Sequence, residues 1–503
     1  MTQKPLHLQP LANVDRTKAS RKSTLHEEYS ISHCGPESCE LKDHDEDEDA
    51  EFAQSLYREI VSECRFVSPE SLKEIPRFTS NEVLEGLALG KGGFGTINAV
   101  KGFSLHARKQ RQVVKTSLGH AGNIDESGHD GEIQARQFIA SHCHHSNGDA
   151  RYALKRLQRK TIADHLLCLQ GMTDLANEAL FLGSIEHPNI IKLRGMAHAD
   201  MMSKDFFLIL DRLYDTLATR LVKWKTEEKK LSGLKRMFCK RCVLHRRYLQ
   251  ADRLNHAADL ASALSYLHQN GILHRDLKPD NIGFDVQGGI KIFDFGLARE
   301  LPKKTKTSYN KFHLTKSAGT PRYMAPEVVT GRYNQACDVY STGLLVWQFI
   351  TLKRPFKDKK CLEDFEEKVW SPNGPQCRPT IPKKVSPGLR QLLVRSWNHN
   401  FEDRPSALEL ENELRFQASQ KEDNMLEKEN DSELGSPASN KTMERGSTFL
   451  LPPGDSDESL ESDSKEVARE RTAFDFFGVS ARSILMRSDR SEVFKSFRSL
   501  PER

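Results

Sequence analysis

Three glycines at the start of the first apolar region constrain the fold more than any other feature of this 503-residue chain. They stand at positions 90, 92 and 95 within Leu89–Ile97, which gives the spacing G-x-G-x-x-G. Glycine lets backbone N–H groups approach a phosphate chain, because no Cβ is in the way. A dinucleotide-binding fold requires a helix directly after such a loop, whereas Thr96–Val100 reads as a strand. The pattern therefore predicts two strands joined by a turn over phosphate.

Four further motifs follow in a fixed order. Lys155 ends the strand-like run Tyr-Ala-Leu-Lys, and Glu178 lies on a helix predicted from about Asp174 to Ser184. Downstream come H-R-D-L-K-P-D-N at 274–281, D-F-G at 294–296 and A-P-E at 325–327. A lysine on a strand or a glutamate on a helix is common on a solvated face. The order of all the motifs along one chain, rather than any single residue, carries the interpretation.

With these residues the chain resembles a eukaryotic protein kinase over about residues 82–415. The resemblance implies an α+β, bilobal protein-kinase fold. A small, mostly antiparallel β lobe (about 82–210) would carry one main helix, and a larger, mostly helical lobe (about 211–415) would follow, with ATP between them. Apolar residues at helical spacing support a buried helix in the large lobe: Leu254, Ala257, Ala258, Ala261, Leu264 and Leu267.

The resemblance also implies transfer of the γ-phosphate of ATP to protein hydroxyl groups, with ATP and Mg²⁺ as cofactors. Such a reaction requires in-line positioning and neutralised phosphate charge. Asp276 is the predicted catalytic residue that accepts the proton of the substrate hydroxyl, and Lys278 would contact the γ-phosphate. Asn281 and Asp294 would supply the hard oxygen ligands that Mg²⁺ prefers.

The predicted ATP contacts come from the glycine loop, the strand with the lysine and the hinge between the lobes. Lys155 would reach the α- and β-phosphates and be held by Glu178, so both are also predicted catalytic residues. Gly283 stands where the family usually has a larger apolar residue, a departure that affects the shape of the adenine pocket. The predicted ATP-binding residues are Leu89, Gly90, Gly92, Gly93, Phe94, Gly95, Ile97, Ala153, Lys155, Leu210, Asp211 and Leu213.

The type of kinase is predicted from the same segments. Lys278 together with Thr320 resembles the serine/threonine type, since tyrosine kinases usually carry Arg and Ala near these positions. The sequences G-T-P-R-Y-M-A-P-E and S-W-N-H-N-F-E-D-R-P-S resemble the tyrosine-kinase-like branch. In the family, Asp338 would brace the catalytic loop and Arg404 would pair with Glu327. A dual-specificity or tyrosine kinase and a non-catalytic kinase-fold scaffold are the alternatives.

The segment between D-F-G and A-P-E is the expected control element. Arg275, directly before the catalytic aspartate, would pair with a phosphate on this segment and order it. The position most often phosphorylated in the family aligns with Lys316, so Thr315 or Ser317 is the predicted phosphosite, unless Lys316 replaces the regulation. Thr320 completes the predicted functional residues of the segment.

Both ends of the chain read as tails. Charged residues make up 29% and hydrophobic residues 37% of the sequence, as expected for a folded core diluted by polar segments. Residues 1–81 are predicted to be a disordered acidic tail, with a short helix within 50–66. Residues 416–503 are predicted to be a mostly disordered, Ser-rich tail. The acidic run of the first tail consists of Asp43, Asp45, Glu46, Asp47, Glu48, Asp49 and Glu51.

Two insertions are predicted inside the kinase region. Two strands and a turn need roughly 15 to 20 residues, so the longer separation of Gly95 from Lys155 makes about 103–150 an insertion. It reads as a mobile, His-rich loop, with metal binding by His142, Cys143, His144 and His145 as the alternative. The second, about 222–250, is basic and reads as a solvated loop. A nucleic acid or an acidic partner, including the acidic run of the tail, is its alternative ligand.

The remaining predictions concern location and partners. No run approaches the roughly 20 apolar residues of a membrane span, and the first residues do not resemble a secretory signal. Ten cysteines without regular spacing, including one C-x-x-C at 239–242, argue against a disulfide framework. A cytoplasmic location is therefore expected, with the nucleus as the alternative. Protein substrates are the expected partners, and the oligomeric state is left open.

Overall fold

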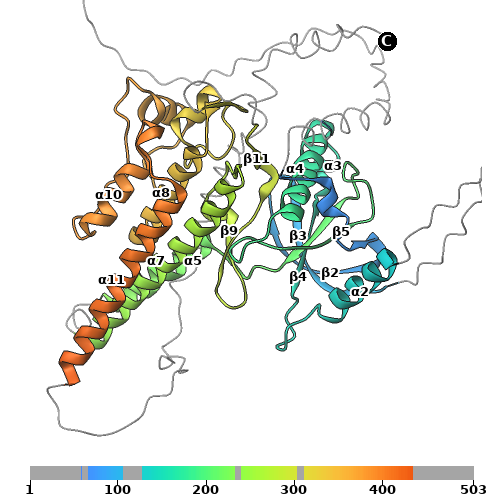
Figure 1. The fold of residues 1–503 in the computed structure, drawn as a ribbon, viewed down its shortest axis with the longest axis horizontal. Helices are drawn as coiled ribbons and strands as arrows, with labels where there is room; N and C mark the ends of the chain where they lie inside the picture. The colour runs from blue at the N-terminus through green and yellow to red at the C-terminus, as the bar shows by residue number, and fades with distance from the viewer. Residues whose placement is uncertain (1–57, 59–65, 106–126, 233–238, 303–310, 434–503) are drawn as a thin grey trace, which may run out of the picture. The chain divides into compact units, whose positions relative to one another are not determined.

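The computed structural model describes residues 58, 66–105, 127–232, 239–302 and 311–433, without the side chains of 127–130, 240 and 422–433 (Figure 1). These residues form a β lobe with one long helix and a helical lobe. The predicted α+β bilobal fold is thus confirmed. The helix predicted within 50–66 and the acidic run at 43–51 lie outside the described residues, apart from Arg58 and Phe66.

The small lobe is built on a six-stranded sheet in the order β1-β5-β6-β4-β3-β2. All neighbouring strands are antiparallel except β1 and β5, so the sheet is mixed. Its register places Ile97 opposite Lys155 and Ala153 opposite Leu210. The strands are β1 (Arg77–Phe78), β2 (Val83–Lys91), β3 (Gly95–Phe103), β4 (Tyr152–Leu157), β5 (Leu193–Ala197) and β6 (Phe207–Asp211).

The main helix of the small lobe is α4 (His165–Ser184), which begins earlier than the predicted Asp174. Asp164 caps its first turn, because its side chain accepts a hydrogen bond from Leu167 N at 3.0 Å. Most of α4 from Cys168 to Leu182 is buried, as expected for a helix packed against a sheet on one side and the large lobe on the other. The other helical elements are η1 (Pro69–Leu72), η2 (Ser80–Glu82), α2 (Ser127–Ser141) and α3 (Arg159–Ile162).

The large lobe centres on α7 (Lys240–Gln269), whose predicted apolar face from Leu254 to Leu267 is buried. Its other helical elements are α5 (Leu217–Leu231), α8 (Ala336–Thr351), α9 (Leu362–Phe365), α10 (Pro387–Ser396), α11 (Ala407–Glu433) and the short η3 (Pro279–Asn281), η4 (Phe295–Leu297), η5 (Pro326–Thr330), η6 (Glu366–Trp370) and η7 (Phe401–Asp403). Its strands are β7 (Asp215–Thr216), β8 (Ile272–Leu273), β9 (Ile282–Phe284), β10 (Ile290–Ile292), β11 (Arg299–Glu300), β12 (Phe312–His313) and β13 (Arg332–Tyr333).

The prediction that disorder extends to residue 81 is wrong for residues 66–81. Phe78 in β1 and Leu72 in η1 are buried in the same core as the sheet. Backbone hydrogen bonds tie this segment to β5 and its end, since Met196 N donates to Pro76 O at 3.0 Å and His198 N donates to Phe78 O at 2.8 Å. Residues 68–74 are mostly polar, so the few apolar side chains that pack here form no pattern that predicts a folded segment.

The prediction that 103–150 is a mobile loop is also wrong for its second half. Residues 127–141 form α2, and Ile139 and Cys143 are buried in the small-lobe core. Arg136 of α2 forms a buried ion pair with Glu82, which is 3% exposed. The insertion therefore contributes core packing, while residues 106–126 lie outside the described residues.

Helices replace the solvated loop predicted at 222–250, because α5 and α7 extend into it from either side of residues 233–238. Helix α11 likewise continues past residue 415, where a tail was predicted. Figure 1 shows α7 and α11 side by side, and Arg415 of α11 contacts Asp259 of α7 at 3.3 Å. Packing between these long helices stabilises stretches whose polar composition favoured a loop.

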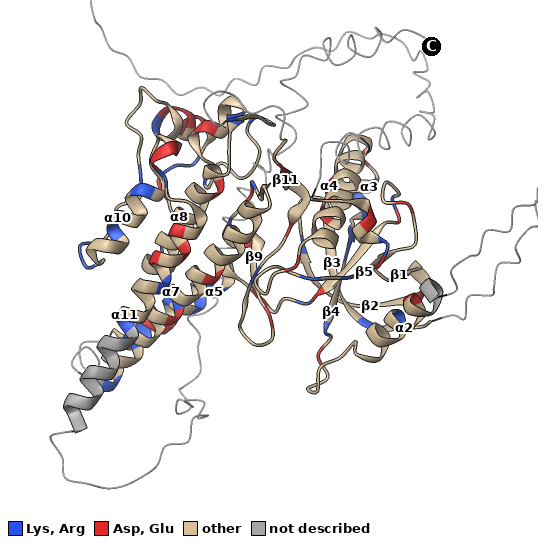
Figure 2. Cartoon of the chain, viewed as in Figure 1, with Lys and Arg blue, Asp and Glu red and all other residues tan. Residues whose placement is uncertain are grey.

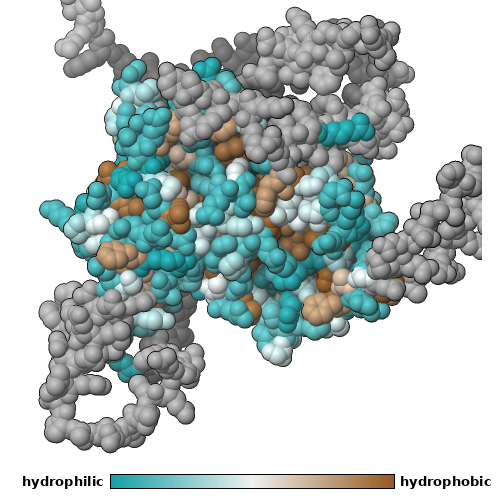
Figure 3. All heavy atoms as spheres, viewed as in Figure 1, coloured by the Kyte–Doolittle hydropathy of each residue, from teal (hydrophilic) through white to brown (hydrophobic). Residues whose placement is uncertain are grey.

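The surface of the described residues is mixed in character. The face drawn in Figure 3 is mostly hydrophilic, with small separate hydrophobic patches. Figure 2 shows basic and acidic residues interspersed along α5, α7 and α11. Arg253 on α7, for example, pairs with Glu228 on α5 at 2.5 Å. No helix within the described ranges is long and apolar enough to cross a bilayer.

Candidate active site

Lys155, Glu178 and Asp294 meet where β4, α4 and the start of η4 converge. The Lys155 ammonium donates to Glu178 Oε2 at 2.5 Å and to Asp294 Oδ1 at 2.8 Å. Glu178 is buried at this contact and 17% of the Lys155 side chain is exposed, whereas 41% of the Asp294 side chain is exposed. Asp294 has φ 66° and ψ 70°, a left-handed conformation that is uncommon for a residue with a Cβ and turns its carboxylate toward the lysine. Residues far apart in sequence thus share one ion-pair cluster.

Asn177, which belongs to none of the sequence motifs, attaches α4 to the D-F-G segment. Its amide Nδ2 donates to the carbonyls of Gly296 at 2.9 Å, Ala298 at 3.1 Å and Phe295 at 3.2 Å. Asn177 is 6% exposed and precedes Glu178 in the sequence. The sequence offered no signal for it, because an asparagine within a helix is usually solvated or neutral in role.

The electrostatics of the cluster keep its charges in place. Burial alone would lower the pKa of Lys155, but the carboxylates of Asp294 and Glu178 outweigh burial and raise it. Burial acts to raise the pKa of Asp294, yet the cations of Lys155 and Lys278 outweigh it and lower the pKa to about 2. Both groups therefore remain charged through the neutral range, as binding of a phosphate chain and a cation requires.

The low pKa of Asp294 predicts a specific acid sensitivity. Its folded pKa of about 2 lies below its ordinary value of 3.8, so its contribution to stability is complete above about pH 4 to 5 and is lost as the pH falls toward 2. We expect about 1 kcal/mol, since solvent screens the exposed part of the side chain. Between about pH 5 and pH 3 the unmodified chain should lose more unfolding free energy than Lys155→Met. Equal losses in urea titrations would contradict this assignment.

Four donors converge on the carboxylate of Asp276. Oδ1 accepts from the backbone N and the hydroxyl of Thr320 at 2.9 and 2.7 Å. Oδ2 accepts from Lys278 Nζ at 2.7 Å and Asn281 Nδ2 at 3.0 Å. Lys278 also donates to the Thr320 hydroxyl at 3.1 Å. The four residues predicted for the catalytic step and its hydroxyl specificity therefore form one cluster, with the carboxylate held in a single orientation.

Asp338 supports the backbone of the catalytic loop, as the resemblance implies. It is 1% exposed on α8, and its carboxylate accepts the backbone N–H groups of His274 at 2.8 Å and Arg275 at 2.9 Å. Arg275 has φ 67°, so the backbone turns sharply at the residue before Asp276. Burial would raise the pKa of Asp338, but hydrogen bonds from His268 and His274 outweigh burial and lower it.

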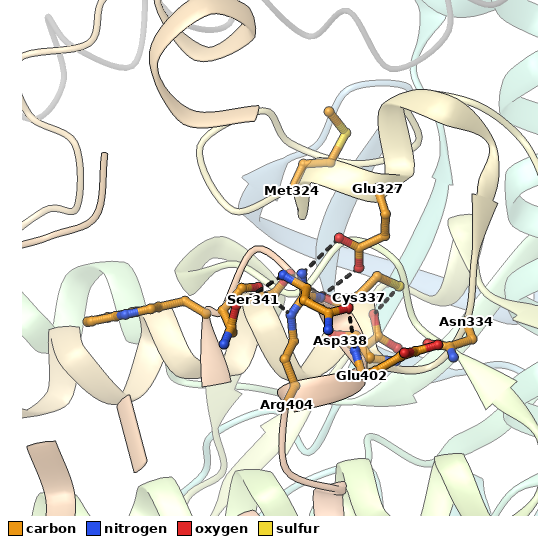
Figure 4. A network of polar contacts seen from close by, with 12 residues as sticks. Met324, Glu327, Asn334, Cys337, Asp338, Ser341, Glu402 and Arg404 are labelled. Atoms are coloured by element: carbon orange, nitrogen blue, oxygen red, sulfur yellow. Dashed lines mark hydrogen bonds and ion pairs between the residues drawn. The ribbon is translucent and has the colours of Figure 1, made fainter. Parts of the chain in front are cut away.

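Glu327 and Arg404 form a second buried support, and Figure 4 shows their side chains pointing toward each other. The pair is bidentate, with Arg404 Nη1 at 2.6 Å from Glu327 Oε1 and Nη2 at 2.8 Å from Oε2. Arg404 Nη1 also donates to Ala336 O at 2.8 Å and Nε to Asn398 O at 2.9 Å. The predicted contact connects the A-P-E segment to the distal part of the large lobe.

The glycine loop joins β2 and β3 as predicted, but its phenylalanine lies against the sheet and α4. Gly92 N donates to Gly95 O at 2.8 Å, which closes the turn. Phe94 packs against the apolar cluster of Leu157 and Met172 rather than extending over a ligand site. The loop is anchored by Gln158, the residue directly after β4, whose backbone N donates to Phe94 O at 3.0 Å and whose Nε2 donates to Gly93 O at 2.9 Å.

At the hinge, Leu210 is buried in β6 and Asp211 forms an ion pair with Arg194 at 2.8 Å. Gly283 lies directly beneath Leu213: a Cβ built on this glycine would come within 2.5 Å of Leu213 Cδ1 and 3.2 Å of Asp215 O. The Leu213 side chain thus occupies space that a larger residue at 283 would fill. The Leu213 side chain therefore compensates for the small residue at position 283, where the family usually has a larger apolar one.

The predicted activation-segment residues lie on the turn that precedes A-P-E. Thr315 is exposed, and its carbonyl accepts a hydrogen bond from the Tyr333 hydroxyl at 2.9 Å. Ser317 is half-buried with φ 52°, and its backbone N donates to Val328 O at 3.0 Å. The Arg275 guanidinium lies 3.4 Å from the same Tyr333 hydroxyl and donates to Leu297 O at 2.6 Å. Residues 303–310 of the segment lie outside the described residues.

Asn281 and Asp294 lie at one end of the β9–β10 hairpin and fit a magnesium ion by their chemistry. Ile282 pairs with Ile292, and Phe293 N donates to Asn281 O at 3.0 Å, which brings the two segments together. The Asn281 amide nitrogen is directed to Asp276, so its carbonyl oxygen is the atom left for a cation. Mg²⁺ is held in proteins by one or two such oxygens with water and phosphate. In the described part of the chain, no group of three or more His, Cys, Asp or Glu residues could hold a metal ion. This finding covers the stretch His142–His145.

Comparison with known families agrees with this geometry. A family model described as the protein kinase domain matches residues 139–414, more than half of the chain. The match begins after the glycine loop, so the assignment of that loop depends on the strands around it.

Individual relatives point the same way. The chain is 38% identical to the serine/threonine-protein kinase STY46 of Arabidopsis thaliana over 31% of its length and 26% of that protein. It is 36% identical to the dual specificity protein kinase shkC of Dictyostelium discoideum over 31% of its length and 30% of that protein. It is 32% identical to the cAMP-dependent protein kinase type 3 of Saccharomyces cerevisiae over 46% of its length and 49% of that protein. The matched part thus spans a quarter to a half of these relatives, and the chain belongs to the protein kinase family.

Proposed function

We propose that this chain transfers the γ-phosphate of ATP to serine and threonine hydroxyl groups of protein substrates, with Mg²⁺ as the metal. The observation that carries the proposal is the Asp276 carboxylate, held by Lys278, Asn281 and Thr320. A carboxylate fixed in this way can orient a substrate hydroxyl and accept its proton. The contact of Thr320 with both Asp276 and Lys278 supports the serine/threonine type.

Each residue of the site has a separate task in this proposal. Lys155, positioned by Glu178, binds the phosphate chain, and Lys278 neutralises charge on the group being transferred. Asn281 and Asp294 would hold Mg²⁺, which would neutralise phosphate charge when bound. Asp276 directs the attacking hydroxyl toward the phosphorus. No bond to the protein is formed, so catalysis depends on position and electrostatics.

The test is phosphate transfer from labelled ATP to a generic basic protein, followed by phosphoamino-acid analysis. We expect phosphoserine and phosphothreonine, a requirement for Mg²⁺ that EDTA removes, and loss of transfer in Lys155→Met. Phosphotyrosine beside them would favour a dual-specificity enzyme, which the name of shkC keeps open as the alternative. Absence of transfer by the unmodified chain would favour the non-catalytic scaffold. Residual transfer at a rate that Lys155→Met leaves unchanged would favour it too, because such transfer does not come from this site.

The contact between Leu213 and Gly283 predicts how the adenine subsite responds to volume. Gly283→Leu should raise the ATP KM about tenfold, since overpacking displaces Leu213 and the hinge backbone that would contact adenine. The double variant Gly283→Leu/Leu213→Ala removes the clash and should recover most of the affinity. An unchanged nucleotide dissociation constant in the single variant, measured by calorimetry, would show that adenine does not bind here.

Regulation at the activation segment is a further part of the proposal. Thr315 is exposed to an upstream kinase, and Arg275 is near enough to the segment to contact a phosphate after a local shift. Replacing Thr315 and Ser317 together by alanine should lower activity severalfold if phosphorylation orders the segment. Full activity of the double variant would favour the alternative in which Lys316 replaces phosphorylation.

The basic helices and the location of the chain lead to two further proposals. The basic residues of 222–250 that the structure describes lie on α5 and α7, and we propose an acidic protein segment rather than a nucleic acid as their partner, because acidic residues intersperse the basic ones. Filter binding to RNA compared with acidic peptides would decide between them. We also propose a cytoplasmic location, with the nucleus as the alternative, to be tested by imaging a fluorescently tagged chain.

A further inference from the structure

Residues 66–78, which precede the glycine loop, connect parts of the molecule that are far apart in sequence. We call this segment the N-terminal brace. One end is fixed to the sheet through β1 and β5, as described above. The other end contacts both the last turns of α4 and Glu300 in β11. A segment with this placement can determine the position of α4 relative to the D-F-G segment.

The contact with β11 is made by backbone N–H groups and one buried carboxylate. Phe66 N lies 3.1 and 3.0 Å from Glu300 Oε1 and Oε2, and Val67 N lies 3.1 Å from Oε2. Glu300 is 7% exposed and Val67 is 3% exposed. Hydrogen bonds from N–H groups to a charged acceptor are stronger than neutral ones, particularly where water is excluded.

The contact with α4 combines hydrogen bonds and apolar packing. Ser68 N donates to Ser184 Oγ at 3.2 Å, and the hydroxyl groups of Ser71 and Ser184 lie 2.7 Å apart. Leu72 is 2% exposed and packs so closely over Gly183 that a Cβ there would overlap it. The last turns of α4 are therefore covered by the brace rather than by solvent.

Each of the two contacts fixes an element next to the catalytic residues. Glu178 lies on α4 just before the turns that the brace covers. Glu300 pairs with Ile272 of β8, the strand that leads into the loop containing Asp276. The brace thus fixes α4 against the strands that carry the catalytic loop and follow the D-F-G segment, in addition to the bonds of Asn177.

We propose that the N-terminal brace holds α4 in the position in which Glu178 contacts Lys155, and that Glu300 is a positioning residue for phosphate transfer. The proposal rests on the proposed function for its effect on activity, but its structural consequence is independent of activity. Release of the brace allows α4 to move away from β11, which lengthens the contact between Glu178 and Lys155 and lowers the rate without removing any group that touches the substrate.

The test compares Glu300→Ala and Ser184→Ala with the unmodified full chain by amide hydrogen exchange and steady-state kinetics. We expect exchange in residues 178–184 to be at least fivefold faster in each variant, with kcat at least fivefold lower and a higher ATP KM. Glu300→Gln, which keeps one acceptor oxygen, should fall between Glu300→Ala and the unmodified chain. Glu70→Gln is the matched control, since Glu70 is an exposed residue of the brace that pairs with Lys73, and should change neither readout.

Unchanged exchange in α4 of Glu300→Ala would overturn the proposal, and so would exchange that rises equally in α4 and in α8 of the large lobe. Unchanged exchange in Ser184→Ala would overturn the part assigned to α4. If the unmodified chain transferred no phosphate, the proposed function would fail, while the exchange measurements would still decide whether the brace holds α4.

Discussion

Replacing Asp276 by asparagine should lower kcat about 10²- to 10⁴-fold, the range expected for loss of a positioned general base. The variant keeps the shape of the side chain but loses the negative charge that faces Lys278, Asn281 and Thr320. Its amide would also place N–H donors against existing donors, so the loop loses orientation as well as charge. ATP affinity should change less than kcat, because the ion pairs of Lys155 with Glu178 and Asp294 do not include Asp276.

The measurement is steady-state transfer to a peptide substrate together with the dissociation constant for ATP. Asp259→Asn is the matched control, because Asp259 of α7 forms a surface ion pair with Arg415 of α11 and is not one of the residues bonded to Asp276. It should retain full activity. If Asp276→Asn kept more than a tenth of the unmodified kcat, the carboxylate would not be the group that accepts the substrate proton.

Replacing Arg404 by alanine should destabilise the large lobe by about 3 to 5 kcal/mol, the cost of leaving one partner of a buried ion pair unpaired. The Arg404 side chain is fully buried and that of Glu327 is 9% exposed. The variant also loses the hydrogen bonds to Ala336 O and Asn398 O and the contact with the Tyr340 ring, whose centroid lies 5.1 Å from the guanidinium. Transfer activity should fall only as far as the folded fraction falls.

Urea unfolding followed by circular dichroism measures this effect. Arg415→Ala serves as the comparison, since its ion pairs with Asp259 and Glu411 are exposed and such pairs contribute about 0 to 1 kcal/mol. The double variant Glu327→Gln/Arg404→Met should recover part of the loss, because no buried charge is then left without a partner. Similar destabilisation by Arg404→Ala and Arg415→Ala would contradict the structural role given to the buried pair.

The parts of the molecule that the sequence predicted well are those whose local pattern reports local chemistry. The glycine spacing predicted the turn between β2 and β3, and the apolar repeat from Leu254 to Leu267 predicted the buried face of α7. The motif order placed Lys155 near Glu178 and Asp276 near Asn281, and the structure brings each pair into hydrogen-bond contact. In each case a small number of residue types can satisfy the geometry.

The errors share a different cause. Residues 66–78, α2 and the first half of α7 are polar on most sides, and their stability comes from a few contacts with distant residues. Glu82 with Arg136 and Glu300 with Phe66 are examples. A prediction from amino-acid composition averages over the whole segment, so it treats such polar segments as disordered and solvent-exposed. Asn177 escaped notice for the same reason, because its partners are carbonyl groups more than a hundred positions away.

The sequence by itself therefore determined the family, the bilobal architecture and the residues placed for chemistry, because catalytic groups and glycine turns tolerate few substitutes. The tertiary structure alone decided that residues 66–81 pack on the small lobe, how the described parts of the insertions pack and which residues hold α4 in place. Those outcomes depend on burial and on hydrogen bonds between segments distant in sequence, and a local pattern carries no record of a partner's position.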